Sequence, residues 1–190
     1  KLTPYFDIPI QHVNDDILKA MNRRGTKTYL QALFDKIRSR VPDCVIRTSL
    51  IAGLPGEGEA EFLELCDFLK RNRLERVGAF VYSPEEGTPA AEMPRPDEET
   101  AKTRAQYIER LQSRIMDEWC QEKVGASIEV LCEGFDDESG LYYGRSQWDS
   151  PDIDSRVWFT GRNFVPGEFV QVAVTAVRDG ELQGAACQEE

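Results

Sequence analysis

Strand and helix patterns alternate along the first part of the chain and give way, near Lys123, to strand patterns alone. Segments 45–52 and 76–83 are rich in β-branched residues and are predicted as strands, and the segment between them, 59–72, carries apolar residues at helical spacing. A strand–helix–strand unit of this length joins parallel neighbours in one sheet. The sequence therefore predicts an α/β unit followed by an all-β domain.

Further elements extend both parts. A short buried strand is predicted at 5–11, at a sheet edge or ending early because of Pro9, followed by a helix that Asn14 caps. More helices are predicted at 28–40 and at 98–122, and the proline-rich stretch 84–96 is an irregular connector. Five strands are expected after Lys123, at 127–133, 141–145, 157–160, 169–177 and 182–186. Five short strands in about 65 residues favour a small closed barrel of the OB type.

The net charge is concentrated in the predicted barrel. The chain carries 34 acidic and 23 basic residues, for a net charge of −11, and residues 123–190 alone hold 13 acidic and 5 basic groups, for −8. Such a balance disfavours indiscriminate binding to a polyanion and favours a basic partner. No apolar run is long enough to cross a membrane, and the start, without Met or an apolar leader, is expected to be a cut into a longer protein.

Few side chains are suited to catalysis. His12 is the single histidine and no Gly-x-Ser-x-Gly motif occurs, so hydrolytic triads lack support. The five cysteines include no CxxC pair, and the closest two, Cys120 and Cys132, are twelve residues apart. They are interpreted as reduced thiols of a cytoplasmic protein. We therefore assign no catalytic residue and no metal ligand to this chain.

The strongest candidate site is the turn 53–57, directly after the predicted strand 45–52. Ligands of α/β folds bind at the carboxyl ends of parallel strands, glycines allow a close backbone approach, and a helix N-terminus offers N–H groups. An ordinary strand-to-helix turn would have the same pattern. Two further candidates are Arg47 and Gln11, for which the alternatives are a surface ion pair and a loop hydrogen bond. The candidate cofactor-binding residues are Gln11, Arg47, Gly53, Pro55, Gly56 and Glu57.

A second candidate lies in the barrel, where segment 144–155 mixes acidic groups with an arginine and an aromatic residue. Such a loop could meet a basic partner, with Trp148 as an anchor. A solvated, turn-rich loop is the alternative. Trp158 alternates with apolar neighbours and is interpreted as core. The candidate docking residues are Arg145, Trp148, Asp149, Asp152 and Asp154.

Four blocks, in order, resemble radical SAM methylthiotransferases. They are 7–12 with 17–25, then 47–57, then 82–90, and finally 144–154. The third and fourth are most similar to the branch that modifies an aspartate of ribosomal small-subunit protein twelve. A sibling branch modifies a tRNA adenosine. The resemblance covers nearly the whole chain.

The resemblance implies a fold and cofactors. Residues 1–95 would be the C-terminal part of a radical SAM (β/α) barrel, which is TIM-like, 96–122 a connecting helix, and 123–188 a TRAM domain. S-adenosylmethionine would lie across the strand ends, near Gln11, Arg47 and the turn 53–57. The family's two 4Fe–4S clusters are held by cysteines that none of those here matches, including a CxxxCxxC motif, so the chain is expected to be inactive alone. In the whole enzyme, cleavage of S-adenosylmethionine gives a 5′-deoxyadenosyl radical that abstracts hydrogen from the substrate.

Charge distinguishes the two branches. A small RNA-binding barrel is expected to have a face rich in Lys and Arg, whereas this one carries a net charge of −8. Ribosomal proteins are basic, so the acidic barrel complements them and repels phosphate. We therefore expect a basic ribosomal protein as the partner, with no membrane and no direct RNA binding, and keep a tRNA substrate as the alternative.

Overall fold

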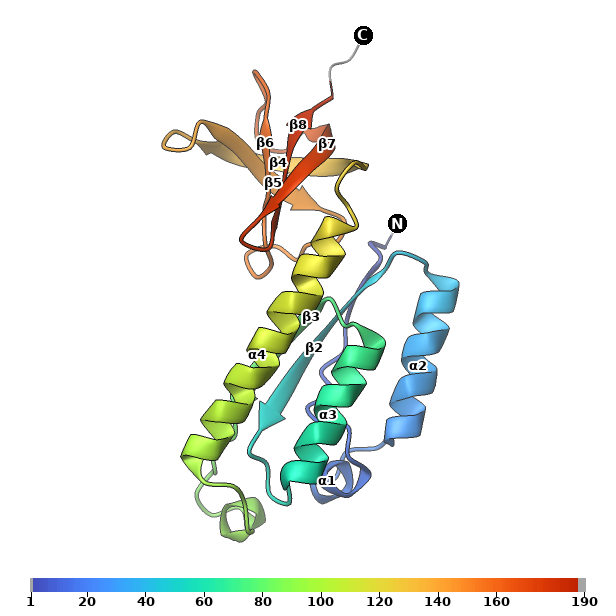
Figure 1. Ribbon diagram of the computed structural model, residues 1–190, viewed down its shortest axis with the longest axis vertical. Coiled ribbons are helices and arrows are strands. Elements are labelled where there is room, and N and C mark those ends of the chain that lie inside the picture. Colours follow the sequence, from blue (N-terminus) through green and yellow to red (C-terminus); the bar gives the residue numbers. More distant parts are fainter. Residues whose placement is uncertain (1, 188–190) are drawn as a thin grey trace. The chain divides into compact units, whose positions relative to one another are not determined.

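The computed structural model describes residues 2–187 as two compact units. One comprises Phe6–Ile115, and the other comprises residues 2–5 together with 116–187. Figure 1 shows helices around a small sheet in the first unit and strands in the second. The predicted boundaries at 95 and 123 remain predictions, and residue 188, the expected end of the TRAM domain, lies outside the described residues.

The first unit is built on a three-stranded sheet of order β1-β2-β3, in which β2 and β3 run parallel, as the sequence predicted. The strands are β1 (Tyr5–Asp7), β2 (Val45–Ala52) and β3 (Arg76–Val81). The helices are α1 (Asp15–Ala20), α2 (Lys27–Arg40), α3 (Glu59–Asn72), the 3-10 helix η1 (Pro89–Glu92) and α4 (Glu98–Gln121). Asn14 caps α1 through its side chain, as predicted.

The core lies on one face of this sheet. Side chains alternate along β2, so that Thr48, Leu50 and Ala52 are buried while the residues between them are only half-buried. The buried set joins apolar side chains of α2, α3 and α4 in one cluster. On the other face Phe80 of the edge strand β3 is 58% exposed. The carboxyl ends of β2 and β3 therefore belong to a sheet that is packed on one side.

Strand β1 is shorter than the predicted strand 5–11. Proline has no N–H to donate at position 9, and the N–H of Ile10 donates to the Thr48 hydroxyl instead of to a strand carbonyl (3.1 Å). Pairing resumes only at Gln11, which forms an isolated parallel bridge with Leu50. The prediction was right about a strand beside β2 and wrong about its length.

The second unit contains a closed barrel of order β4-β5-β6-β8-β7, which confirms the predicted five strands. They are β4 (Ser127–Asp136), β5 (Leu141–Ser146), β6 (Val157–Thr160), β7 (Phe169–Arg178) and β8 (Glu181–Ala186). Strands β6 and β8 pair in parallel and the other neighbours antiparallel. Gly144 of β5 faces β4 so closely that a Cβ there would overlap the Leu131 carbonyl. This glycine therefore has a structural role.

No helix within residues 2–187 combines the length and the apolar character that crossing a membrane requires.

Candidate functional site

The turn 53–57 follows β2 directly and is closed by its own hydrogen bonds. The N–H of Gly53 donates to the Glu57 carboxylate (3.0 Å), that of Gly56 to the carbonyl of Pro94 (3.2 Å) and that of Glu57 to the carbonyl of Leu54 (3.0 Å). These three N–H groups of the turn are thus already used within the chain. The expected donors at the N-terminus of the following helix are a different set, and ligand binding at this turn stays a prediction.

The two glycines of the turn are favoured by different structural constraints. Both have positive φ, +85° at Gly53 and +84° at Gly56, which favours glycine. A Cβ on Gly53 would also overlap the Cβ of Ala101 on α4, whereas nothing lies within 4 Å of the corresponding position at Gly56. The close approach predicted from Gly53 is therefore made to the chain's own helix.

Glu57 points inward rather than toward solvent, since it is 2% exposed. One carboxylate oxygen accepts from Gly53 and from the Arg104 guanidinium (2.8 Å), and the other lies 3.5 Å from Nε2 of His12. Arg104 also donates to the Glu57 carbonyl (2.9 Å). Burial alone raises the pKa of Glu57, but the contact with His12 and the hydrogen bonds from Gly53 and Arg104 outweigh it and hold the pKa below the ordinary value.

Glu57 therefore supports the turn as a buried carboxylate and has no access to a ligand in this structure. Arg104 lies 47 residues further along the chain, and the sequence analysis did not single it out. The sequence feature that could have indicated its role is an arginine on the face of α4 that otherwise carries apolar residues.

Gln11 lies beside the end of β2. Its N–H donates to the carbonyl of Ser49, and its carbonyl accepts from Ile51, both at 2.9 Å. Its φ is +67°, and the N–H of His12 donates to the carbonyl of Ile10, which defines a γ-turn of the strained kind. Such a conformation costs about 1–3 kcal/mol and is characteristic of functional sites. The structure thus brings Gln11 to the same edge as the turn 53–57.

Arg47 lies near the opposite end of β2. It forms an ion pair with Asp7 (2.9 Å), which was the alternative interpretation. Gly53 lies six positions further along the chain, a span of roughly 20 Å. Arg47 and the turn are therefore not brought together.

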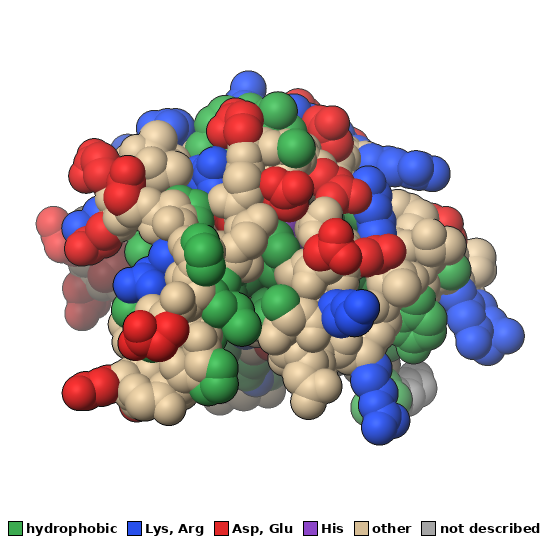
Figure 2. Space-filling view, turned by 90° about the horizontal axis from the view of Figure 1, so that it is seen from below, with side chains coloured by type: hydrophobic (Ala, Val, Ile, Leu, Met, Phe, Trp, Pro, Cys, Tyr) green, Lys and Arg blue, Asp and Glu red, His purple; other side chains and the backbone are tan. Residues whose placement is uncertain are grey.

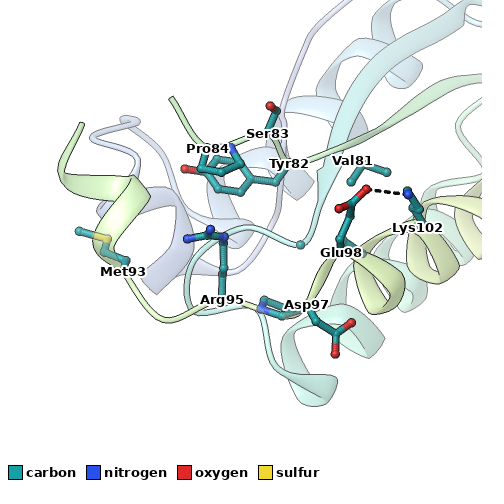
Figure 3. A pocket seen from close by; sticks show the side chains of 12 residues that line it. Val81, Tyr82, Ser83, Pro84, Met93, Arg95, Asp97, Glu98 and Lys102 are labelled. Atoms are coloured by element: carbon teal, nitrogen blue, oxygen red, sulfur yellow. Dashed lines mark ion pairs between the residues drawn. The ribbon is translucent and has the colours of Figure 1, made fainter. Parts of the chain in front are cut away.

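A cavity of about 710 Å³ opens at the carboxyl end of β2 and β3. Figure 3 shows Tyr82, Ser83 and Pro84 from the segment after β3 on one side of it, with Arg95, Asp97 and Glu98 from the connector and the start of α4. Glu98 pairs with Lys102 (2.6 Å). Asp97 accepts the N–H of Thr100 (2.7 Å), and this bond lowers the pKa of its carboxyl.

The cavity offers both signs of charge next to apolar and aromatic surface, which suits a small zwitterionic ligand with an aromatic part. Figure 2, which looks onto this end of the strands, shows apolar side chains gathered in the middle with charged side chains around them. The sequence predicts a ligand at this edge, whereas its proline-rich stretch 84–96 predicts only an irregular connector.

Residues 2–187 contain no group of three or more His, Cys, Asp or Glu side chains placed to hold a metal ion. Four of the five cysteines are buried. Burial raises the pKa of Cys66 to about 11, and those of Cys44 and Cys132 are raised for the same reason. Thiolates, which bind metals, are thus disfavoured at these three positions.

In the barrel, the predicted anchor Trp148 is buried, at 5% exposed. Its ring packs edge-on against Trp119, with centroids 5.4 Å apart, and the Lys123 ammonium lies 4.4 Å from its centroid. Trp148 therefore cannot act as an exposed anchor, and this prediction is corrected. Conversely, Trp158 is only half-buried, packs on Tyr143 and donates from Nε1 to Glu181 (2.6 Å).

The acidic loop is held together by two of its own aspartates. Asp149 accepts from the N–H and the hydroxyl of Ser146 (2.9 and 2.6 Å), and Asp154 accepts from the N–H of Ser150 (2.8 Å) and the hydroxyl of Tyr5 (2.6 Å). Arg145 is paired with Glu133. Asp152 is exposed. Of the predicted docking residues, Asp152 is the one whose charge is most available to a partner.

A pair of substitutions tests this distinction. Asp149→Ala removes two hydrogen bonds to a carboxylate, so we expect it to destabilise the barrel by about 1–3 kcal/mol. Asp152→Ala, which removes the same charge from an exposed position, is expected to change stability by less than about 0.5 kcal/mol. Urea unfolding followed by tryptophan fluorescence measures both, because all three tryptophans lie in the unit that contains the barrel. Equal losses in the two variants would contradict the structural role of Asp149.

Comparison with known proteins accounts for both units. Residues 2–69 match the model of the radical SAM superfamily, and residues 124–187 match the model of the TRAM domain. Two similar relatives are named ribosomal protein uS12 methylthiotransferase RimO. The one from Caldicellulosiruptor saccharolyticus is 42% identical, and the one from Desulforamulus reducens is 43% identical, each over 97% of this chain and 42% of the relative.

The chain belongs to the radical SAM methylthiotransferase family. It spans about two fifths of the length of these methylthiotransferase relatives. A solved structure, the radical SAM enzyme coproporphyrinogen III oxidase (HemN) from Escherichia coli, has a TM-score of 0.50 at 13% identity over 76% of this chain and 41% of that one. At this identity the likeness shows the fold alone. Together with the radical SAM match of residues 2–69, it confirms the predicted radical SAM barrel fragment.

Proposed function

We propose that this chain is part of an enzyme that methylthiolates an aspartate of the small-subunit ribosomal protein uS12. The observation that carries the proposal is the similarity to RimO proteins along nearly the whole chain, through both the α/β unit and the barrel. A similarity confined to residues 2–69 would support only a radical SAM enzyme of some kind. The similarity that continues through the barrel is what supports the uS12 substrate in this proposal.

The cofactor in this proposal is S-adenosylmethionine, bound at the carboxyl end of β2 and β3. When bound, S-adenosylmethionine and two 4Fe–4S clusters held by residues outside this chain would supply the radical and sulfur-transfer chemistry. The cavity carries both signs of charge. Arg95 would face the cofactor's carboxylate, and Asp97 and Glu98, which also bind Thr100 and Lys102, would face its cationic groups. Gln11 and the turn 53–57 border the same edge, whereas Arg47 lies apart from it.

The partner in this proposal is basic, and the barrel is acidic. Residues 123–190 carry a net charge of −8. Because Asp149 and Asp154 are engaged within their loop, the charges most available for docking are the exposed ones, among them Asp137 and Glu138 in the β4–β5 turn and Asp152. Opposite charges of this kind accelerate and orient association and are weakened by salt.

A tRNA substrate remains the second candidate because of one observation. Tyr143 of β5 and Trp158 of β6 pack together, and the Arg156 guanidinium lies 4.4 Å from the Tyr143 centroid. Barrels of the OB type bind oligonucleotides on these two strands, with aromatic and arginine side chains. The acidic charge opposes such binding, so we favour the protein substrate.

The test is a titration of the 190-residue chain with purified uS12 and, separately, with an anticodon stem-loop RNA, each at two salt concentrations. We expect binding to uS12 that weakens with salt and no binding to the RNA. The variant Asp137→Asn with Glu138→Gln should bind uS12 roughly threefold to tenfold more weakly. The matched control, Asp67→Asn with Glu109→Gln, removes two charges from exposed helix positions of the other unit and should bind as the original chain does. Binding to RNA alone would overturn the proposal.

A further inference from the structure

His12 is fully buried, and its two ring nitrogens face different parts of the fold. Nδ1 accepts the N–H of Asn14 at 3.0 Å, so the ring proton lies on Nε2. Nε2 lies 3.5 Å from Oε2 of Glu57. Within the described residues, neither of these two buried atoms has a hydrogen-bond partner that meets ordinary criteria, so each is the nearest available partner of the other.

The backbone is strained where it delivers this side chain. Gln11 has a φ of +67°, and the γ-turn that it centres is closed by the N–H of His12 itself. Strain of this kind persists only where the surroundings impose it, and it is concentrated at functional sites. Here the strained residue immediately precedes the buried imidazole.

Contacts continue from His12 in both directions. Asn14 caps α1 with Oδ1 and donates from Nδ2 to Glu64 (2.8 Å). Glu57 accepts from Gly53 and Arg104 through its other oxygen, Oε1. The imidazole therefore lies between the capped start of α1 and the carboxylate that closes the turn 53–57.

We propose that His12 is a positioning residue for this turn. Its Nε2–H orients the Glu57 carboxylate so that Oε1 faces the Gly53 N–H and the Arg104 guanidinium. The turn is thereby held at the edge where, according to the proposed function, the cofactor binds. Only this last step rests on the proposed function, since the effect of His12 on the turn stands on the contacts alone.

Two substitutions separate the donor from the rest of the ring. His12→Gln places an amide N–H near the position of Nε2 and can still donate to Glu57. His12→Asn carries its amide near the position of Nδ1 and cannot reach Glu57. Val13→Ala is the matched control, because Val13 is equally buried and adjacent in the chain but makes no polar contact to the turn.

The first readout is amide hydrogen exchange in the 190-residue chain. We expect exchange of the Gly53 amide to accelerate about tenfold in His12→Asn and less than about threefold in His12→Gln. In Val13→Ala, exchange should accelerate across the core without selecting Gly53. Equal acceleration in the two His12 variants, or none in either, would overturn the proposal.

The second readout is the dissociation constant for S-adenosylmethionine, measured by calorimetry on the same variants. We expect His12→Asn to bind about tenfold more weakly and His12→Gln to retain most of the affinity. If the original chain does not bind S-adenosylmethionine, the cofactor placement in the proposed function fails while the exchange result still decides the role of His12. Loosening of the turn with unchanged affinity would overturn the link to the cofactor.

Discussion

Replacing Glu57 with alanine is expected to lower the free energy of unfolding of the 6–115 unit by about 3–5 kcal/mol, as for other buried ion pairs that lose one partner. The substitution leaves the Arg104 guanidinium, whose side chain is 9% exposed, without its buried carboxylate. It also leaves the Gly53 N–H without its acceptor. Both groups are shielded from the water that would otherwise replace the lost bonds.

Two optical signals separate this effect from a general loss of structure. All three tryptophans belong to the unit that contains the barrel, whereas α1, α2 and α3 belong to the other. Urea unfolding followed by circular dichroism at helical wavelengths should therefore show the loss, and tryptophan fluorescence should show little change. Glu57→Gln keeps the size and one acceptor oxygen and is expected to lose less. An unfolding midpoint that Glu57→Ala leaves unchanged would contradict the structural role of this carboxylate.

The Glu57 carboxylate also makes the free energy of unfolding fall at acidic pH. The folded pKa of Glu57 is lowered, because the contact with His12 and the hydrogen bonds from Gly53 and Arg104 outweigh the burial that raises it. Its contribution to stability is therefore present above the ordinary pKa of a glutamate and is lost as the pH falls through the lowered folded value. Urea unfolding at a series of pH values measures this loss, and in Glu57→Gln the fall of stability at acidic pH should be smaller. An identical fall in that variant would show that Glu57 is not its source.

The local elements of this site were predictable, and its long-range contacts were not. Strand β2 and helix α3 have the predicted bounds, because β-branched residues, glycines and helical apolar spacing are all local signals. Arg104, which completes the Glu57 network, comes from a helix 47 residues away. Local periodicity indicates that such a side chain faces inward, but it does not say which group it meets there.

The prediction of an exposed surface in the acidic loop 144–155 of the barrel was wrong for a similar reason. Its composition indicated a docking surface, but Asp149 and Asp154 accept hydrogen bonds that close the loop, and Trp148 packs inside on Trp119. Aspartate side chains bond readily to nearby backbone N–H groups in turns, so an acidic sequence does not by itself mean an exposed acidic surface. Within this loop Asp152 is exposed, and its part in docking stays a prediction.

Replacing Gly53 with alanine is expected to destabilise the same unit by about 2–5 kcal/mol, from two separate causes. The first is the φ of +85°, which a residue with a Cβ adopts at a cost of about 1–2 kcal/mol. The second is overlap of the new Cβ with that of Ala101, which is buried at 3% exposed and cannot move without shifting α4. Urea unfolding followed by circular dichroism measures the total.

Two further variants separate the backbone cost from the overlap cost in the destabilisation by Gly53→Ala. Gly56→Ala has nearly the same φ, +84°, with nothing within 4 Å of the new Cβ, so it should show only the backbone cost. Ala101→Gly together with Gly53→Ala removes the overlap, and the double variant should be more stable than the sum of the two single losses by about 1–3 kcal/mol. If Gly53→Ala and Gly56→Ala cost the same, the packing of α4 against the turn contributes nothing. A larger loss at Gly53 would mean that α4 packing fixes the position of the turn. Gly53 and Ala101, which both line the cavity, would then hold one part of its wall in place.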